Sequence, residues 1–207
     1  MNDPIRIATV PALVTTAILV LALAEPASAT TYNVDRFDDS TTNTCGGGAG
    51  DCALRGAIIA ANNNAGDDVV RLPAGTYTLS IAGAYEDFCQ TGDLDVRDGL
   101  TIVGDGPENT IIDAGGNGGV NDRVLDIHAP GQRLTLRGVT ITGGSPDTEI
   151  GGGIRALDGS LRLETCAVPG NEPPTASPGV AIDSMSDAPA DLTETADSSI
   201  THNTPPH

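Results

Sequence analysis

The sequence predicts an all-β protein built as a solenoid of short stacked strands, a parallel β-helix. From Asp67 onward, apolar residues alternate with polar partners over short segments, glycine-rich turns join these segments, and no helix-length pattern separates them. Alternation with period two is typical of strands that bury one face. The alternating apolar pairs are Val70 and Leu72, Tyr77 and Leu79, Leu100 and Ile102, Leu125 and Ile127, Leu134 and Leu136, and Leu161 and Leu163.

A weak internal repeat supports the solenoid. Three segments align, and their starts are 34 and 27 residues apart: Leu100–Gly104, Leu134–Gly138 and Leu161–Thr165. Periods of this size are typical of units that bury their inward faces only against their neighbours. A β-sandwich is the main alternative, because short alternating strands with glycine-rich turns suit that architecture as well.

The first 29 residues have the features of a secretory signal peptide. Arg6 gives a positive start, an apolar run extends from Ala12 to Ala24, and small residues end at Ala29. The run is too short to cross a bilayer, which takes about 20 residues. We therefore expect a protein that is secreted or held at the cell surface, with no transmembrane segment after cleavage.

Two further segments follow the signal peptide. Residues 30–168 hold the predicted strands and, before them, a short helix over Cys52–Ala61, with Asp51 as its N-cap and apolar residues recurring at helical spacing. The asparagines and glycine after it predict its end. Residues 169–207 form a Pro-rich acidic tail with fragments of further strands.

Charge and cysteine content restrict the partners. The net charge is −18 and all ten basic residues are arginine, which argues against nucleic acid because phosphate binding needs clustered cations. Four cysteines in an exported chain without a Cys-x-x-Cys pair favour disulfides over a metal. Cys45 and Cys52, separated by a glycine-rich loop, are the predicted pair, whereas Cys89 and Cys166 either pair with each other or stay free.

Several ordered blocks resemble a known family. The segment Cys52–Asn62 is similar to the Cys-Ser-Leu-Arg-Glu-Ala-Ile segment of CSLREA-type bacterial exported proteins, and Leu72–Tyr77, Gly92–Val96 and Leu100–Gly104 resemble the blocks that follow it. The resemblance implies a cap helix on a right-handed parallel β-helix similar to pectin lyases. Ala53 and Gly56 depart from the family segment, so a contact made by its glutamate is missing here.

The strongest acidic constellation is Asp93, Asp95 and Asp98. The first two share one face of a strand and the third sits at its turn, an arrangement that predicts a calcium site, since calcium prefers several oxygen ligands. The alternative is that these residues are solvated parts of an acidic surface.

Signals for catalysis are weaker. A lyase needs a cationic base, for which arginines are present by type, and a hydrolase needs paired carboxylates, for which Asp113 and Asp126 are the nearest candidates. Tyr85 and Phe88 are candidates to stack on sugar rings, whereas Tyr77 suits the core, and the histidines are isolated. The arginine candidates are Arg97, Arg123, Arg137 and Arg155.

These observations favour a non-catalytic exported protein of the surface or matrix that presents a face to polysaccharide or to another protein. The alternative is a calcium-assisted polysaccharide lyase or glycoside hydrolase, which rests on fold similarity alone. A truncated relic without its own function is a third interpretation. The catalytic residues stay unassigned, and calcium is the one cofactor that the sequence suggests.

Overall fold

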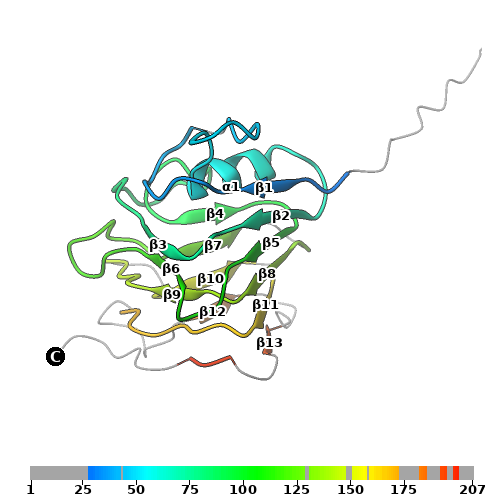
Figure 1. The fold of residues 1–207 in the computed structure, drawn as a ribbon. Helices are drawn as coiled ribbons and strands as arrows, with labels where there is room; N and C mark the ends of the chain where they lie inside the picture. Colours follow the sequence, from blue (N-terminus) through cyan, green and yellow to red (C-terminus); the bar gives the residue numbers. More distant parts are fainter. Residues whose placement is uncertain are drawn as a thin grey trace, which may run out of the picture.

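A computed structural model describes residues 28–42, 44–128, 131–147, 151–157, 159–172, 182–185, 192–194 and 198–200 (Figure 1). Nearly all of the predicted signal peptide, along with His202 and His207, lies outside these residues. Within them, no helix is long and apolar enough to cross a membrane.

The helix α1 spans Leu54–Asn62 and packs against the first strands at one end of the molecule (Figure 1). Its N-cap is Ala53, which makes no side-chain cap hydrogen bond, so the prediction of Asp51 as N-cap is wrong. The Asp51 carboxylate instead accepts hydrogen bonds from the backbone N–H groups of Gly46 and Gly48 within the loop. The asparagine after the helix ends it as predicted, with Asn63 as C-cap.

Thirteen strands form three parallel sheets among the described residues (Figure 1). The six-stranded sheet contains β1 (Thr31–Asn33), β2 (Asp68–Arg71), β5 (Leu100–Val103), β8 (Arg133–Arg137), β11 (Ser160–Glu164) and β13 (Leu192–Glu194). The four-stranded sheet contains β4 (Leu94–Val96), β7 (Leu125–His128), β10 (Ile154–Leu157) and β12 (Ile182–Met185). The three-stranded sheet contains β3 (Gly75–Thr78), β6 (Thr110–Asp113) and β9 (Thr140–Thr142).

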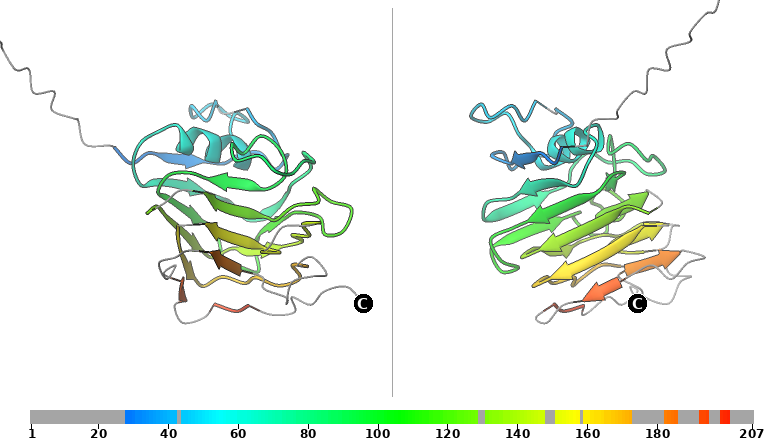
Figure 2. Two further views of the ribbon diagram at one scale, coloured as in Figure 1. Left: turned by 180° about the vertical axis from the view of Figure 1, so that it is seen from behind. Right: turned by 90° about the vertical axis from the view of Figure 1, so that its right-hand side faces the viewer.

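Corresponding residues of the predicted repeat pair with one another on neighbouring strands. Leu100 pairs with Leu134, which pairs with Leu161, on neighbouring strands of the six-stranded sheet. All three side chains are buried, as is the next row, formed by Ile102, Leu136 and Leu163. Figure 2, in its right-hand view, shows the strands of this sheet one below another. The core therefore consists of rows of aliphatic side chains that run across the strands.

The predicted fold class, an all-β right-handed parallel β-helix, is wrong as stated. The strands lie in three separate parallel sheets, and these do not form a clearly closed solenoid. The strands are three to five residues long, and irregular segments such as 79–93 and 114–124 occupy the path between sheets. A buried helix is also part of the core. The β-sandwich alternative fails as well, because every strand pairing is parallel.

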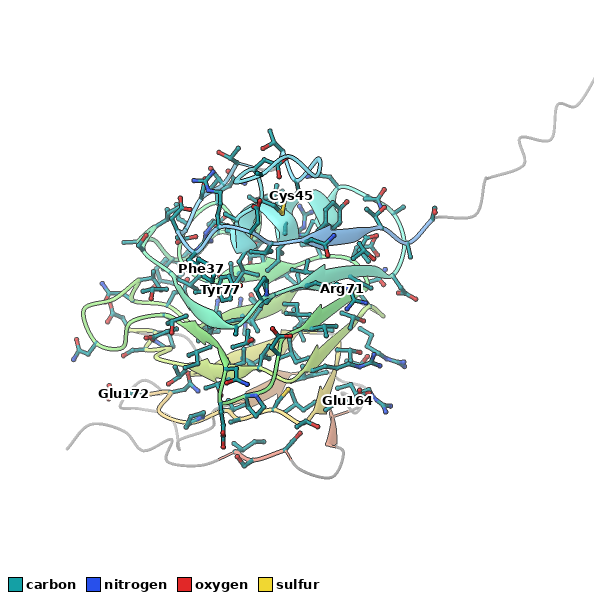
Figure 3. The ribbon with its side chains drawn as sticks, viewed as in Figure 1. Phe37, Cys45, Arg71, Tyr77, Glu164 and Glu172 are labelled. Carbon is teal, nitrogen blue, oxygen red and sulfur yellow. A yellow bond between two sulfur atoms is a disulfide. The ribbon has the colours of Figure 1, made fainter. Side chains whose placement is uncertain are left out.

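The cysteines divide into one pair and two free thiols. Cys45 and Cys52 form a disulfide with a Cα–Cα distance of 4.4 Å, as the flanking glycine-rich loop predicts. Cys89 and Cys166 are both free and buried. Beside this loop, Phe37 stacks on Tyr77 with 5.2 Å between ring centroids (Figure 3), and Tyr77 is buried, which confirms its predicted place in the core.

Candidate functional sites: a buried acidic cluster and an arginine face

The four-stranded sheet gathers three carboxylates on one face. Asp95 lies on β4, Asp93 precedes it by two residues, and Asp126 on β7 is the register partner of Asp95. One oxygen of each of the three carboxylates lies within 4.8 Å of the others, and all three residues are buried. The interpretation of Asp93 and Asp95 as solvated surface residues is therefore wrong. We name Asp93, Asp95 and Asp126 the acidic cluster.

Asp98 is not part of this cluster, although the sequence grouped it with the other two. Its carboxylate accepts hydrogen bonds from the backbone N–H groups of Gly66 and Gly99, at 3.2 and 2.8 Å. These bonds hold the turn that leads into β5. The sequence missed Asp126 because spacing along one strand does not reveal which residue of the next strand lies opposite.

Two arginines bind the acidic cluster. Arg123 donates from Nε to Asp93 Oδ2 at 2.9 Å, and its Nη2 lies 3.6 Å from both Asp122 and Asp126. Arg155, on the strand after Asp126, donates from Nε to Asp126 Oδ1 at 3.0 Å and from Nη2 to its other oxygen. Buried carboxylates require such partners, because burying an unpaired charge is costly.

Asp95 has a weaker set of partners. Its Oδ2 accepts a hydrogen bond of 2.6 Å from the backbone N–H of Cys89, and its Oδ1 has no hydrogen-bond partner among the described residues. Burial, together with the charge of the neighbouring Asp93, raises the pKa of Asp95 to about 9. Asp95 is thus a buried acid without a cationic partner of its own.

Arg55 of α1 fixes the loop that leads into the cluster. Its guanidinium donates to the backbone carbonyls of Gly92 and Asp93, at 2.7 and 2.8 Å, and pairs with the Asp39 carboxylate, with 2.6 Å between Nε and Oδ1. Burial acts to raise the pKa of Asp39, but the hydrogen bond and charge of Arg55 hold it below its usual value. The sequence analysis gave Arg55 no role of its own, although Arg55 matches the arginine of the segment that Cys52–Asn62 resembles.

A rim of exposed groups lies on one side of Asp126. His128 Nδ1 is 3.4 Å from Asp87 Oδ1 and 4.0 Å from Asp126 Oδ2, with side chains 37% and 47% exposed for His128 and Asp87. The sequence analysis predicted that His128 is isolated, but the structure places it beside two carboxylates. This rim connects the buried cluster with the surface.

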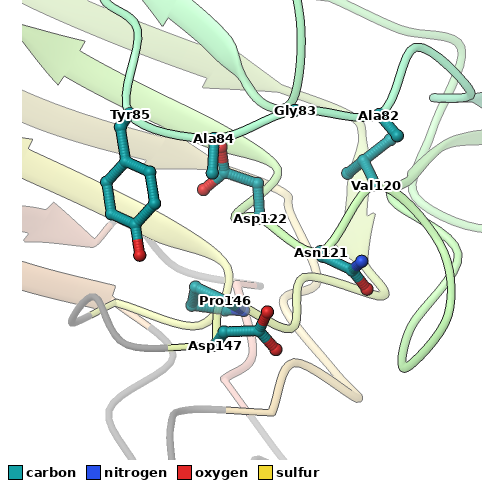
Figure 4. A pocket seen from close by; sticks show the side chains of 9 residues that line it. All are labelled: Ala82, Gly83, Ala84, Tyr85, Val120, Asn121, Asp122, Pro146 and Asp147. Carbon is teal, nitrogen blue, oxygen red and sulfur yellow. The ribbon is translucent and has the colours of Figure 1, made fainter.

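A pocket of about 240 Å³ lies nearby (Figure 4). Tyr85 stands at its edge, 68% exposed and with a left-handed φ of 64°, and Asn121, Asp122 and Asp147 supply polar groups. Phe88 is 60% exposed and carries the Arg97 guanidinium 4.4 Å above its ring. Both aromatic rings predicted as sugar contacts are accessible, although the acidic groups at the pocket suit a cationic or neutral ligand.

The outer face of the six-stranded sheet carries a second constellation, which we name the arginine face. Arg133, Thr135 and Arg137 of β8 alternate with the buried leucines of that strand, so they point away from the core. Arg162 pairs in register with Thr135, and Arg71 lies two strands from Arg137 in the same row. Arg71 and Glu164 are found on this side of the molecule in Figure 3.

The arginine face holds few compensating acids. Glu164 accepts from Arg137 and Arg162, with Nε to carboxylate distances of 2.5 Å in each pair. No described residue forms an ion pair with Arg71 or Arg133. A polar hollow of about 380 Å³ opens on the same face; its lining includes Asp67, Thr101, Gln132, Arg133, Thr135 and Ser160.

The residues proposed for catalysis do not converge. Asp113 lies on β6 of the three-stranded sheet and accepts a hydrogen bond from Gly115, whereas Asp126 belongs to the four-stranded sheet. Among the arginine candidates, Arg123 and Arg155 are held by carboxylates, and Arg137 lies on the six-stranded sheet. The structure therefore brings Arg123 and Arg155 together with Asp126 in the buried cluster, but it does not bring Asp113 to the same place.

Comparison with known proteins adds no assignment. No protein-family model matches the chain, and no curated protein or solved structure matches it either. The resemblance to CSLREA-type proteins rests on the quoted sequence blocks alone.

Proposed function

We propose that this protein is an exported, non-catalytic binding module that holds an acidic polysaccharide against the arginine face. The observation that carries the proposal is the concentration of Arg71, Arg133, Arg137 and Arg162 on one sheet face of a chain with a net charge of −18. Guanidinium groups bind carboxylates through paired, charge-assisted hydrogen bonds. A polymer of uronate sugars supplies carboxylates at regular intervals.

The shape of the face supports an extended ligand. Neighbouring strands of a sheet lie about 4.8 Å apart, so the register places successive side chains at that interval across the face. Arg71 and Arg137 lie in one row and are separated by one strand. Thr101 and Thr135 pair in the neighbouring row, where Thr135 is only 6% exposed. The arginines are therefore the repeated donors that this face presents to a repeating ligand.

The overall negative charge does not exclude a negatively charged ligand. At physiological ionic strength, charges separated by more than about 8 Å are largely screened, so the local arginines dominate over acids elsewhere on the molecule. We expect binding to be weak at very low salt, where the net charge repels the polymer, strongest at moderate salt and weak again at high salt.

The proposal is tested by calorimetric titration of the secreted protein with polygalacturonate and, in parallel, with a neutral glucan. The double variant Arg71→Ala/Arg133→Ala should lose about tenfold in affinity for polygalacturonate, since each exposed ion pair contributes about 0.2–1 kcal/mol and tenfold corresponds to about 1.4 kcal/mol. Arg36→Ala is the matched control, because Arg36 pairs with Asp38 outside this face.

Two results would overturn the proposal. One is equal affinity of wild type and double variant, or equal affinity for the neutral glucan. The other is the formation of unsaturated uronate products, measured by their absorbance when calcium is present. A binding module leaves the polymer intact and forms no such products.

A further inference from the structure

We infer that the acidic cluster binds one calcium ion, with Asp93, Asp95 and Asp126 as its protein ligands. The oxygens of these residues lie within 4.8 Å of one another, the span that two calcium–oxygen bonds of about 2.3–2.6 Å can bridge. The inference is independent of the arginine face, which belongs to a different sheet.

The charges around the cluster call for a cation. Four carboxylates gather here, from the cluster and from Asp122, and the guanidiniums of Arg123 and Arg155 are the cations that pair with them. Asp95 is fully buried, and no guanidinium forms an ion pair with it among the described residues. Buried charges are costly unless paired, and one divalent cation supplies the missing charge.

Asp95 Oδ1 is the second, independent sign of a ligand. The residue is fully buried, and this oxygen has no hydrogen-bond partner among the described residues. Its other oxygen is fixed by the backbone N–H of Cys89, so Oδ1 is the atom left to coordinate an ion. Buried polar atoms in native proteins are nearly always satisfied, and an orphan atom requires an explanation.

The chemistry of the ligands selects the ion. All three are carboxylates, which suit hard cations, and a dry site favours calcium over magnesium, because magnesium gives up its water ligands reluctantly. Access is from the side of Asp87 and His128, whose exposed side chains approach Asp126.

The experiment compares melting temperatures of the full secreted protein at pH 7.5 after removal of metal with a chelator, with and without added calcium chloride. With calcium in large excess over its dissociation constant, we expect an increase of roughly 5 °C, because a ligand that binds only the folded state stabilises it. Calorimetry should give one ion per chain.

Two variants make the test specific. Asp95→Asn retains the shape of the side chain but loses the coordinating charge, so its melting temperature should no longer respond to calcium. Asp98→Asn is the matched control, because Asp98 lies on the same segment but outside the cluster, and it should respond as wild type does.

The inference is overturned if wild type shows neither the shift nor bound calcium. It is equally overturned if Asp95→Asn responds like wild type, or if Asp98→Asn loses the response to the same extent. Because no polysaccharide is present, failure here leaves the proposed binding of polymer unaffected.

Discussion

At the scale of single residues, the side chain of Arg55 joins several parts of the fold, although the sequence analysis gave it no role. Arg55 is completely buried, yet its guanidinium is bonded to one carboxylate and to the carbonyls of the segment before β4. It connects α1 to the loop that carries Cys89 and Asp93. Removing one partner of a buried ion pair leaves the other charge buried without compensation.

We therefore expect Arg55→Leu to lower the free energy of unfolding by about 3–5 kcal/mol, measured by urea denaturation. Arg36→Leu is the control and should change stability little, since Arg36 and Asp38 form an exposed pair. Equal effects of the two variants would show that Arg55 does not anchor the loop.

Asp95 gives a pH dependence of stability. Its pKa in the folded protein, about 9, lies above the unfolded value of about 3.9, so the folded state binds the extra proton between these values. The stabilisation of the folded state by this proton is fully present below about pH 4 and is lost as the pH rises through 9. In chelator, the melting temperature should fall over this window in wild type and fall less steeply in Asp95→Asn; identical profiles would contradict the assignment.

At the scale of elements, the rows of aliphatic side chains join one strand to the next. Leu136 lies at the centre of such a row, between Ile102 and Leu163, and it is fully buried. Its contacts come from strands far apart in sequence, so a cavity there weakens several strands together.

Leu136→Ala should lower the free energy of unfolding by about 2–5 kcal/mol in urea, because it removes buried methyl groups and leaves a cavity. Arg137→Ala, the next residue but on the outer face, should cost far less. Similar losses for both would mean that the alternation of β8 does not separate core from surface.

Local pattern predicted much of this element structure. Alternation identified the residues that form the aliphatic rows, helical spacing identified α1, and the glycine-rich loop identified the disulfide of Cys45 and Cys52. Features set by pairing across the sheet were missed. The partnership of Asp95 with Asp126 and the grouping of arginines on one face depend on strand register, and the expected closed solenoid failed because irregular segments separate three sheets.

At the scale of the whole molecule, charge is distributed unevenly. The chain is strongly acidic, yet four of its ten arginines lie on the outer face of the six-stranded sheet. The four-stranded sheet instead carries buried carboxylates. The two sheets therefore differ in chemistry: one carries arginines on its outer face, and the other carries buried carboxylates.

The alternation of β8 determines both which of its residues form the core and which form the arginine face. Arg133, Thr135 and Arg137 are directed outward only because Leu134 and Leu136 are directed inward. Inserting a single residue before this strand without a compensating bulge would reverse its parity, placing guanidiniums in the interior and leucines in water. The exposure of these arginines and the burial of these leucines therefore depend on the same alternation, so an insertion that moved the arginines would also disrupt the core.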